Sequence, residues 1–206
     1  ATRGAAASES AKDTVRHQAA KGTQVALSGL TIGNGLAVAS NGGGILVDAS
    51  AVLTVSNSTL SNNTAASDGG GIENVGTLTV TGSTLSGDSA AGNKGGAIEN
   101  LGGTLTVADS ILAGNHADSS GGAIANNAGT LTVTGSTLSD NHAKRGSGGA
   151  ILNFGMLTVS GSTLSNNSAA YGGGILTGQG LNGQTATVAN STLTGNTAAF
   201  TGGGID

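Results

Sequence analysis

Residues 69–94, GGGIENVGTLTVTGSTLSGDSAAGNK, are one copy of a repeat that runs through most of the chain. Each copy opens with a Gly-Gly-Gly-Ile or Gly-Gly-Ala-Ile block, which leads into a Leu-Thr-Val run and then a Ser-Thr-Leu-Ser-x-Asn run. The isoleucine of the block recurs at spacings of 27, 26, 26, 27, 24 and 30 residues, at Ile45, Ile72, Ile98, Ile124, Ile151, Ile175 and Ile205. A period of this length indicates a solenoid, in which each copy packs only on its neighbours.

The alternation of apolar and polar residues within each copy predicts β-strands. In residues 77–81, TLTVT, Leu78 and Val80 point one way and the three threonines the other, which is the period of a strand. The next residue is glycine, asparagine or aspartate in six copies, and these types tolerate a left-handed bend. The bend residues are Asn57, Gly82, Asp109, Gly135, Gly161 and Asn190. Beyond the bend we expect an inward leucine column at Leu60, Leu85, Leu112, Leu138, Leu164 and Leu193.

Short strands of the same orientation cannot pair with their chain neighbours as hairpins, but each can pair with the equivalent strand one copy later. The prediction is an all-β, single-stranded right-handed parallel β-helix (solenoid), with about 26 residues and three short strands per rung and roughly seven rungs, ~4.8 Å apart. We expect residues 25–206 to form this β-helix, cut from a longer array. Residues 1–24 are expected to form an N-terminal arm or a capping helix between Ser8 and Lys21.

Composition supports an ordered chain with a narrow aliphatic core. The 206 residues include 39 glycines but no proline, cysteine or tryptophan, and only one tyrosine and two phenylalanines. The missing proline suits a fold in which nearly every backbone N–H donates a ladder hydrogen bond. A net charge of −4 without a basic stripe disfavours nucleic-acid binding, and the apolar runs are too short to be transmembrane segments. Without cysteine, neither a disulfide scaffold nor a thiolate metal site is possible.

Two columns of asparagine are expected to stabilise corners of the coil. Stacked amides can hydrogen-bond along a column and to the backbone of turns. One column consists of Asn74, Asn100, Asn126 and Asn153, and the other of Asn63, Asp88, Asn115, Asn141, Asn167 and Asn196. We interpret both as structural ladders and not as binding sites.

The Gly-Gly-Ala-Ile blocks at 95–98, 121–124 and 148–151, combined with an apolar-x-x-Asn motif such as 164–167 (LSNN), resemble polymorphic outer-membrane protein repeats. Those repeats form passenger domains of bacterial autotransporters and adhesins, and the resemblance covers residues 42–206. In that family the second motif usually begins with Phe, whereas here it begins with Leu. The resemblance implies a β-helix in a secreted or bacterial cell-surface protein, such as an adhesin or a stalk.

Two pairs of side chains are candidates for chemistry. Glu73 and Glu99 occupy one outward position on adjacent rungs, so their carboxylates are expected ~5 Å apart, the separation of a retaining glycosidase pair. The alternative is two solvated surface glutamates. His116 and His142 share another column and are expected within ~5 Å of each other, but no third metal ligand is apparent and ordinary turn residues are the better interpretation. We therefore expect no catalytic residue, no metal and no cofactor.

Outward threonines form ranks along the predicted sheet. A rigid sheet would space them at ~4.8 Å across strands and ~7 Å along them, an arrangement that resembles the ice-binding surfaces of antifreeze proteins. The alternative is that threonine simply suits exposed strands, and interruptions at Ala108, Met156 and Ala189 favour it. The ranks contain Thr54, Thr77, Thr79, Thr81, Thr104, Thr106, Thr130, Thr132, Thr134, Thr158, Thr185 and Thr187.

Polar or aromatic exceptions in the variable loop before the Gly-Gly block are the candidate partner contacts, namely Lys94, Lys144, Arg145 and Tyr171. The leading hypothesis is a non-enzymatic structural or adhesive module whose partner is a host surface, a glycan or another extracellular ligand. Ice binding is the main alternative, with ice as the partner. A polysaccharide lyase or hydrolase is the second alternative.

Overall fold

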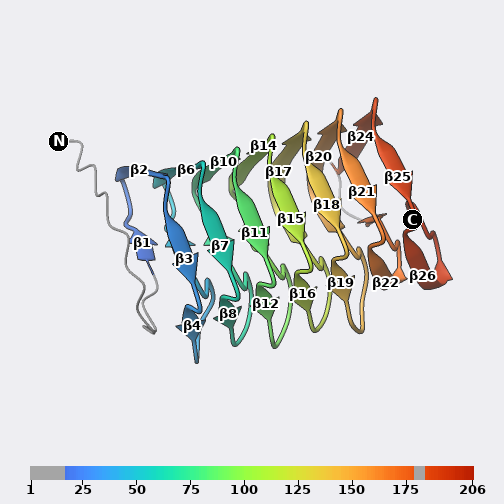
Figure 1. The fold of residues 1–206 in the computed structure, drawn as a ribbon, viewed down its shortest axis with the longest axis horizontal. Coiled ribbons are helices and arrows are strands. Elements are labelled where there is room, and N and C mark those ends of the chain that lie inside the picture. The colour runs from blue at the N-terminus through green and yellow to red at the C-terminus, as the bar shows by residue number, and fades with distance from the viewer. Residues whose placement is uncertain (1–16, 179–183) are drawn as a thin grey trace.

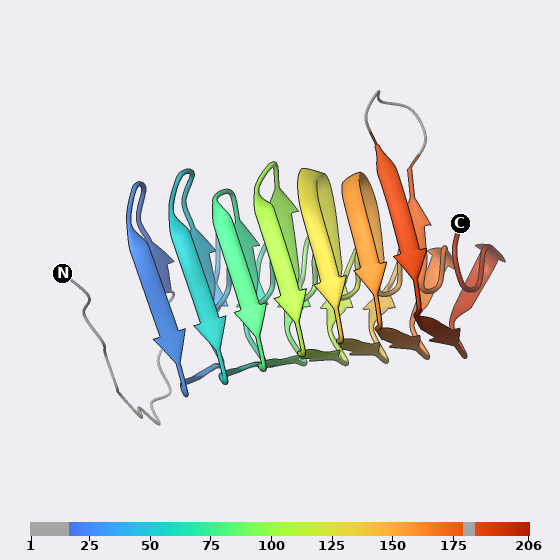
Figure 2. The same cartoon turned by 90° about the horizontal axis from the view of Figure 1, so that it is seen from above.

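The computed structural model describes residues 17–178 and 184–206, and all regular secondary structure in these two ranges is β-strand. The strands form coils stacked along one long axis, with residues 17–37 at one end and residues 185–206 at the other (Figure 1). Seen from above, each coil brings the chain back to the same side of the molecule before the next coil begins (Figure 2).

Three parallel sheets form the walls of the solenoid. Sheet A has twelve strands: β1 (His17–Ala19), β2 (Gln24–Ser28), β5 (Ile45–Val47), β6 (Val52–Ser56), β9 (Ile72–Asn74), β10 (Thr77–Thr81), β13 (Ile98–Leu101), β14 (Thr104–Ala108), β17 (Ile124–Thr134), β20 (Ile151–Ser160), β23 (Ile175–Thr177) and β24 (Thr185–Ala189). Sheet B has seven: β3 (Thr31–Gly33), β7 (Thr59–Ser61), β11 (Thr84–Ser86), β15 (Ile111–Ala113), β18 (Thr137–Ser139), β21 (Thr163–Ser165) and β25 (Thr192–Thr194). Sheet C has seven: β4 (Leu36–Ala37), β8 (Thr64–Ala65), β12 (Ser89–Ala90), β16 (His116–Ala117), β19 (His142–Ala143), β22 (Ser168–Tyr171) and β26 (Thr197–Thr201).

Every strand pairs in parallel with the equivalent strand of the next copy. Leu78, for example, lies opposite Leu53 on one side and Leu105 on the other, and Leu105 lies opposite Leu131. The prediction of stacked parallel coils, about seven in number, is confirmed. The number of strands per copy was underestimated, because sheet A receives two segments from each copy. These segments are continuous only in β17 and β20, where no break separates the Ile-x-Asn part from the Leu-Thr-Val part.

The N-terminal prediction needs correction where the structure describes it. His17–Ala19 form strand β1, paired with Ile45–Val47 of β5, and are not part of a helix. A turn follows, in which the Thr23 amide donates to the Ala20 carbonyl and Gly22 has a φ of 74°. Residue 17 is therefore already in the first coil, because its backbone can pair with the next copy. The rest of the predicted arm or helix, residues 1–16, lies outside the described residues.

The core is a set of aliphatic columns. The expected leucine column is confirmed, since Leu60, Leu85, Leu112, Leu138 and Leu164 are fully buried and Leu193 packs against the same cluster. The Leu and Val positions of sheet A and the isoleucine of each block complete the interior. Sheet C faces inward only with alanine: Ala37, Ala65, Ala90, Ala117, Ala143 and Ala169. The interior narrows there, which explains why the core needs no aromatic side chain.

Both predicted asparagine ladders are present and buried. In the first, Nδ2 of each asparagine donates to Oδ1 of the next, with distances of 2.7, 2.7 and 2.8 Å from Asn74 to Asn153. In the second, Oδ1 of each residue accepts from the backbone N–H of the residue one rung earlier, and also from its Nδ2 where that residue is asparagine, as Asn141 does from Asn115 at 3.0 Å in both cases. A third ladder, missed in the sequence, joins the backbone N–H of one serine to the hydroxyl of the next through Ser58, Ser83, Ser110, Ser136, Ser162 and Ser191.

Left-handed residues turn the chain between the sheets. All six predicted bend residues have positive φ, between 47° and 57°. A second column of such residues, Asn34, Asn62, Gly87, Gly114, Asp140, Asn166 and Gly195, makes the next bend, between sheets B and C. Ordinary side chains are strained in this region, which is why glycine, asparagine and aspartate occupy both columns.

Candidate functional site

Glu73 and Glu99 lie opposite each other on β9 and β13, as their shared position in the repeat predicted. Both interpretations, a catalytic pair and two solvated glutamates, placed these side chains on the outer surface. This placement was wrong, because Glu73 is only 6 % exposed and Glu99 only 2 %. The Asn41 side chain donates to Glu73 at 2.8 Å, and that of Asn127 donates to Glu99. These amides lie on rungs either side of the pair. A polysaccharide would therefore find no accessible carboxylate here.

The surroundings of Glu99 favour its neutral form. Burial is the main cause that raises the pKa of Glu99 to about 8, and the negative charges of Asp68 and Glu73 raise it further. The hydrogen bond from Asn127 and the positive charge of Lys94 lower this pKa, but by less. Its Oε2 atom is buried and has no hydrogen-bond partner. A raised pKa is often found in an acid catalyst, but this carboxyl is almost completely buried, since Glu99 is only 2 % exposed.

His116 and His142 are stacked on sheet C, with ring centroids 5.2 Å apart, so their predicted proximity is confirmed. Burial lowers the pKa of His116, and the nearby His142 and Lys144 lower it further. Asp118 raises this pKa, but by less. Nδ1 of His142 lies 2.7 Å from the Ser168 hydroxyl. Among the described residues, no group of three or more His, Cys, Asp or Glu side chains could hold a metal ion. The pair is best explained as stacked surface residues.

The four predicted partner contacts do not form one column. Lys94 and Tyr171 occupy equivalent positions on different rungs, where the backbone carbonyl accepts from the N–H of the first glycine of the previous block. Two rungs lie between them, and these have Ser120 and Ser147 at the same position. Lys144 and Arg145 lie earlier in the loop, and both pair with Asp118, at 3.5 and 3.2 Å.

A stacked aromatic pair lies at this same edge. Tyr171 is 41 % exposed and packs against Phe200, which is 70 % exposed, with ring centroids 5.0 Å apart. Ser147, two residues after Arg145, pairs with Tyr171 across the rungs, so the loop that contains the two cations lies one rung before Tyr171. We call Lys144, Arg145, Tyr171 and Phe200 the loop-edge patch. Phe200 was missed in the sequence, although its position one copy after Tyr171 was a signal that could have found it.

The threonine ranks lie on sheet A as predicted. Thr54, Thr79, Thr106, Thr132, Thr158 and Thr187 are in register across six consecutive strands. Sheet B carries a second rank, missed in the sequence analysis, at Thr31, Thr59, Thr84, Thr137, Thr163 and Thr192, interrupted by Ile111. Two walls of the solenoid therefore present rows of hydroxyl and methyl groups.

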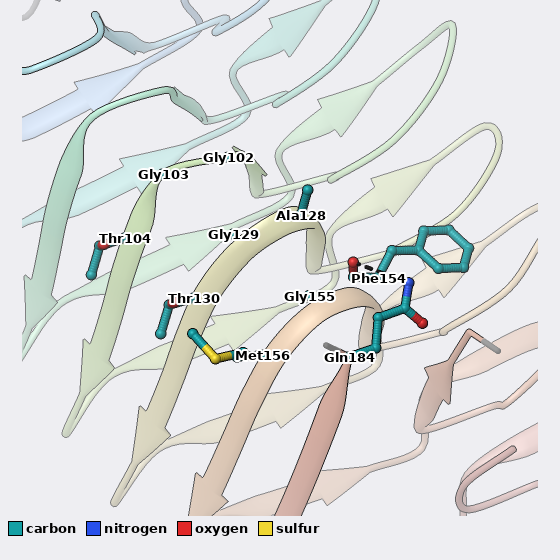
Figure 3. Close-up of a pocket in the computed structure, with 10 residues that line it drawn as sticks. All are labelled: Gly102, Gly103, Thr104, Ala128, Gly129, Thr130, Phe154, Gly155, Met156 and Gln184. Carbon is teal, nitrogen blue, oxygen red and sulfur yellow. Dashed lines mark hydrogen bonds between the residues drawn. The ribbon is translucent and has the colours of Figure 1, made fainter. Parts of the chain in front are cut away.

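A shallow hollow of about 400 Å³ lies over the corner where β17 and β20 bend (Figure 3). Thr104, Thr130 and Met156 line one side, and Phe154 and Gln184 the other, with bare glycine backbone between them. Gln184 donates to the Phe154 carbonyl at 3.3 Å. None of the ten lining residues has a side chain that titrates, so the hollow offers no general acid, base or nucleophilic carboxylate.

Comparison with known proteins agrees with this architecture. Residues 43–206 match the family described as the right-handed β-helix region. The chain belongs to the right-handed β-helix family. No curated protein and no solved structure matches the chain. The family fixes the fold and its predicted handedness, but members of one fold differ in function. In the part of the chain that the structure describes, no helix is long and apolar enough to cross a membrane.

Proposed function

We propose that this β-helix is a non-enzymatic structural module of a secreted or bacterial cell-surface protein, and that it binds an extracellular ligand such as a glycan through the loop-edge patch. The observation that supports the proposal most is the concentration of rare side chains in this patch. The whole chain has three aromatic residues, and two of them are stacked in this patch, which also contains two cations one rung earlier. Exposed aromatic and arginine side chains are the types that most often dominate binding energy at an interface.

The stacked coils suit a supporting role. Each rung hydrogen-bonds to the next along three sheets, and three buried side-chain ladders reinforce the corners. A solenoid of this kind extends surface features along one direction without adding a second domain. The buried state of Glu73 and Glu99 argues against the polysaccharide-cleaving alternative at that pair.

Removal of the patch is expected to remove binding. The double variants Tyr171→Ala/Phe200→Ala and Lys144→Gln/Arg145→Gln should each weaken binding to an array of immobilised neutral and acidic oligosaccharides by about tenfold or more, because hot-spot residues of these types contribute at least that much. Lys21→Gln, at an exposed cation on the first coil, is the matched control and should bind normally. Equal binding by all four proteins would exclude the patch, and no binding by the unaltered chain would exclude glycans.

Ice binding is a second candidate, supported by the register of the sheet A threonines across six strands. If the ordered threonines contact ice, the chain should show thermal hysteresis. Thr106→Tyr should abolish most of this hysteresis, because one bulky side chain would hold the flat face away from the ice surface. Ser89→Tyr on sheet C is the control and should leave the hysteresis unchanged. Absence of hysteresis and of ice-crystal shaping in the unaltered chain would reject this candidate.

A further inference from the structure

Asp88 interrupts the second ladder, which has asparagine at the equivalent position of five other copies. It is 0 % exposed and lies between Asn63 and Asn115. Its Oδ1 atom does what the asparagine oxygens do: it accepts from the backbone N–H of Asn63 at 2.8 Å and from Asn63 Nδ2 at 2.9 Å. Its Oδ2 atom is buried and has no hydrogen-bond partner.

Oδ2 occupies the place of an amide nitrogen. A Cβ added to Gly71 would lie 2.9 Å from this oxygen, whereas a Cβ added to Gly44 or Gly174 would lie 3.3 Å from the Nδ2 atom of the ladder asparagine there. The nitrogen at this place donates twice in other copies. In Asn115, for example, Nδ2 donates to Asn141 Oδ1 at 3.0 Å and to the Leu85 carbonyl at 3.1 Å.

The same geometry directs Asp88 Oδ2 towards two acceptors. The register of sheet B aligns Leu60 with Leu85, so the acceptors equivalent to those of Asn115 are the Leu60 carbonyl and Asn115 Oδ1. An ionised carboxylate has no hydrogen to donate and would place a negative charge against both oxygens. A protonated carboxyl has one O–H, which can donate to one of them.

We propose that Asp88 is held as a neutral carboxylic acid whose Oδ2–H completes the ladder, so that the fold contains a built-in pH-sensitive joint between the Asp88 rung and its neighbours. Below neutral pH the protonated Asp88 donates a hydrogen bond where the ladder asparagines of the other rungs donate theirs. As the pH rises through neutrality, the proton is lost and the ladder contains a buried, uncompensated charge.

In the part of the chain that the structure describes, no charged side chain contributes to the pKa shift of Asp88. The elements packed against it are the turns that contain Asn63 and Asn115 and the glycine block that ends at Gly71. Two titratable residues beside these elements interact elsewhere: His116, next to Asn115, stacks on His142, and Asp68, next to the glycine block, accepts from the Lys94 backbone N–H. In agreement, the pKa of Asp88 is raised to about 7 by burial, opposed only by the two hydrogen bonds from Asn63.

The sign of the pH effect follows from this shift. The unfolded chain loses the Asp88 proton near its ordinary value of 3.8, whereas the folded chain retains it to about 7. The stabilisation is therefore complete below about pH 4 and is lost as the pH rises to about 7, and the unfolding equilibrium constant rises about a thousandfold across this window.

The test compares two proteins in which Glu99, whose pKa burial also raises, is replaced by a neutral residue: Glu99→Gln and Glu99→Gln/Asp88→Asn. Urea unfolding from pH 4 to pH 9 should show a loss of stability with rising pH in the first that is absent from the second, and the two should differ most above pH 7. Asparagine completes the ladder at the other copies, so the double variant is expected to fold. Equal pH dependence in the two proteins would overturn the proposal.

A second measurement needs no variant. The side-chain carboxyl carbon of Asp88, followed by NMR in the unaltered folded chain, should titrate near pH 7. Titration near pH 4 would show that the carboxylate is ionised inside the ladder, and the proposal would fail even if the variants differed in stability.

Discussion

Alanine in place of Gly122 is expected to destabilise the protein by about 3–5 kcal/mol, because the added methyl group has no room between two rungs. Gly122 is the second glycine of its block. A Cβ there would overlap the carbonyl oxygen of Gly149 and lie 2.6 Å from the backbone nitrogen of His142. Gly149 lies in the next block and His142 lies further along the same copy, but both atoms are backbone atoms, so neither can rotate away. Relief requires the rungs to separate, which breaks their ladder hydrogen bonds.

The neighbouring position provides the control. Ala123 is the third residue of the same block, and that position is glycine in four other blocks, at Gly44, Gly71, Gly174 and Gly204. Ala123→Gly should therefore cost only about 1–2 kcal/mol, from lost methyl burial and added chain entropy. Chemical denaturation of both variants measures the difference. If Gly122→Ala were no more destabilising than Ala123→Gly, close approach between the blocks would not be what restricts the second position to glycine.

Most of the fold follows from the repeat. The period, the alternation in TLTVT and the restriction of one position to glycine, asparagine and aspartate together predict stacked coils, inward leucines and left-handed bends. They do so because parallel pairing between copies places equivalent residues side by side. What the repeat does not contain is the path of the chain around a corner. The Ile-x-Asn segment therefore could not be recognised as a separate strand, and the serine ladder was not distinguished from ordinary strand alternation.

The site residues were predicted less well, for a related reason. Glu73 was assigned to the outside because it follows a buried isoleucine in an alternating pattern. Alternation gives the face of a sheet on which a side chain lies, but not whether a loop from the same rung or the next covers that face. The amides of Asn41 and Asn127 cover the two glutamates from positions 32 and 28 residues away. Residues that differ from the repeat in a single copy, such as Phe200 and Asp88, were likewise overlooked, because a column is interpreted by the residue type that most copies share.

Truncation of one ladder asparagine is expected to cost about 2–4 kcal/mol, because it leaves buried polar groups without partners. Asn141 takes part in four buried side-chain hydrogen bonds. Its Oδ1 accepts from the backbone N–H and Nδ2 of Asn115, and its Nδ2 donates to the Leu112 carbonyl at 3.0 Å and to Asn167 Oδ1 at 2.9 Å. Asn141→Ala removes all four and leaves the Asn115 amide without its acceptor. Denaturation at pH 7 measures the loss.

The matched variant Asn141→Asp separates the shape of the side chain from its donors. An aspartate keeps the oxygen that accepts from Asn115, and when protonated it can still donate once, as we infer for Asp88. Asn141→Asp should therefore be much more stable than Asn141→Ala at pH 4 and lose that advantage by pH 8, because the carboxylate would then face the Leu112 carbonyl and Asn167 Oδ1 without a hydrogen. If the two variants were equally destabilised at both pH values, the ladder would depend on the complete amide, and a protonated acid would not be an adequate substitute at any rung.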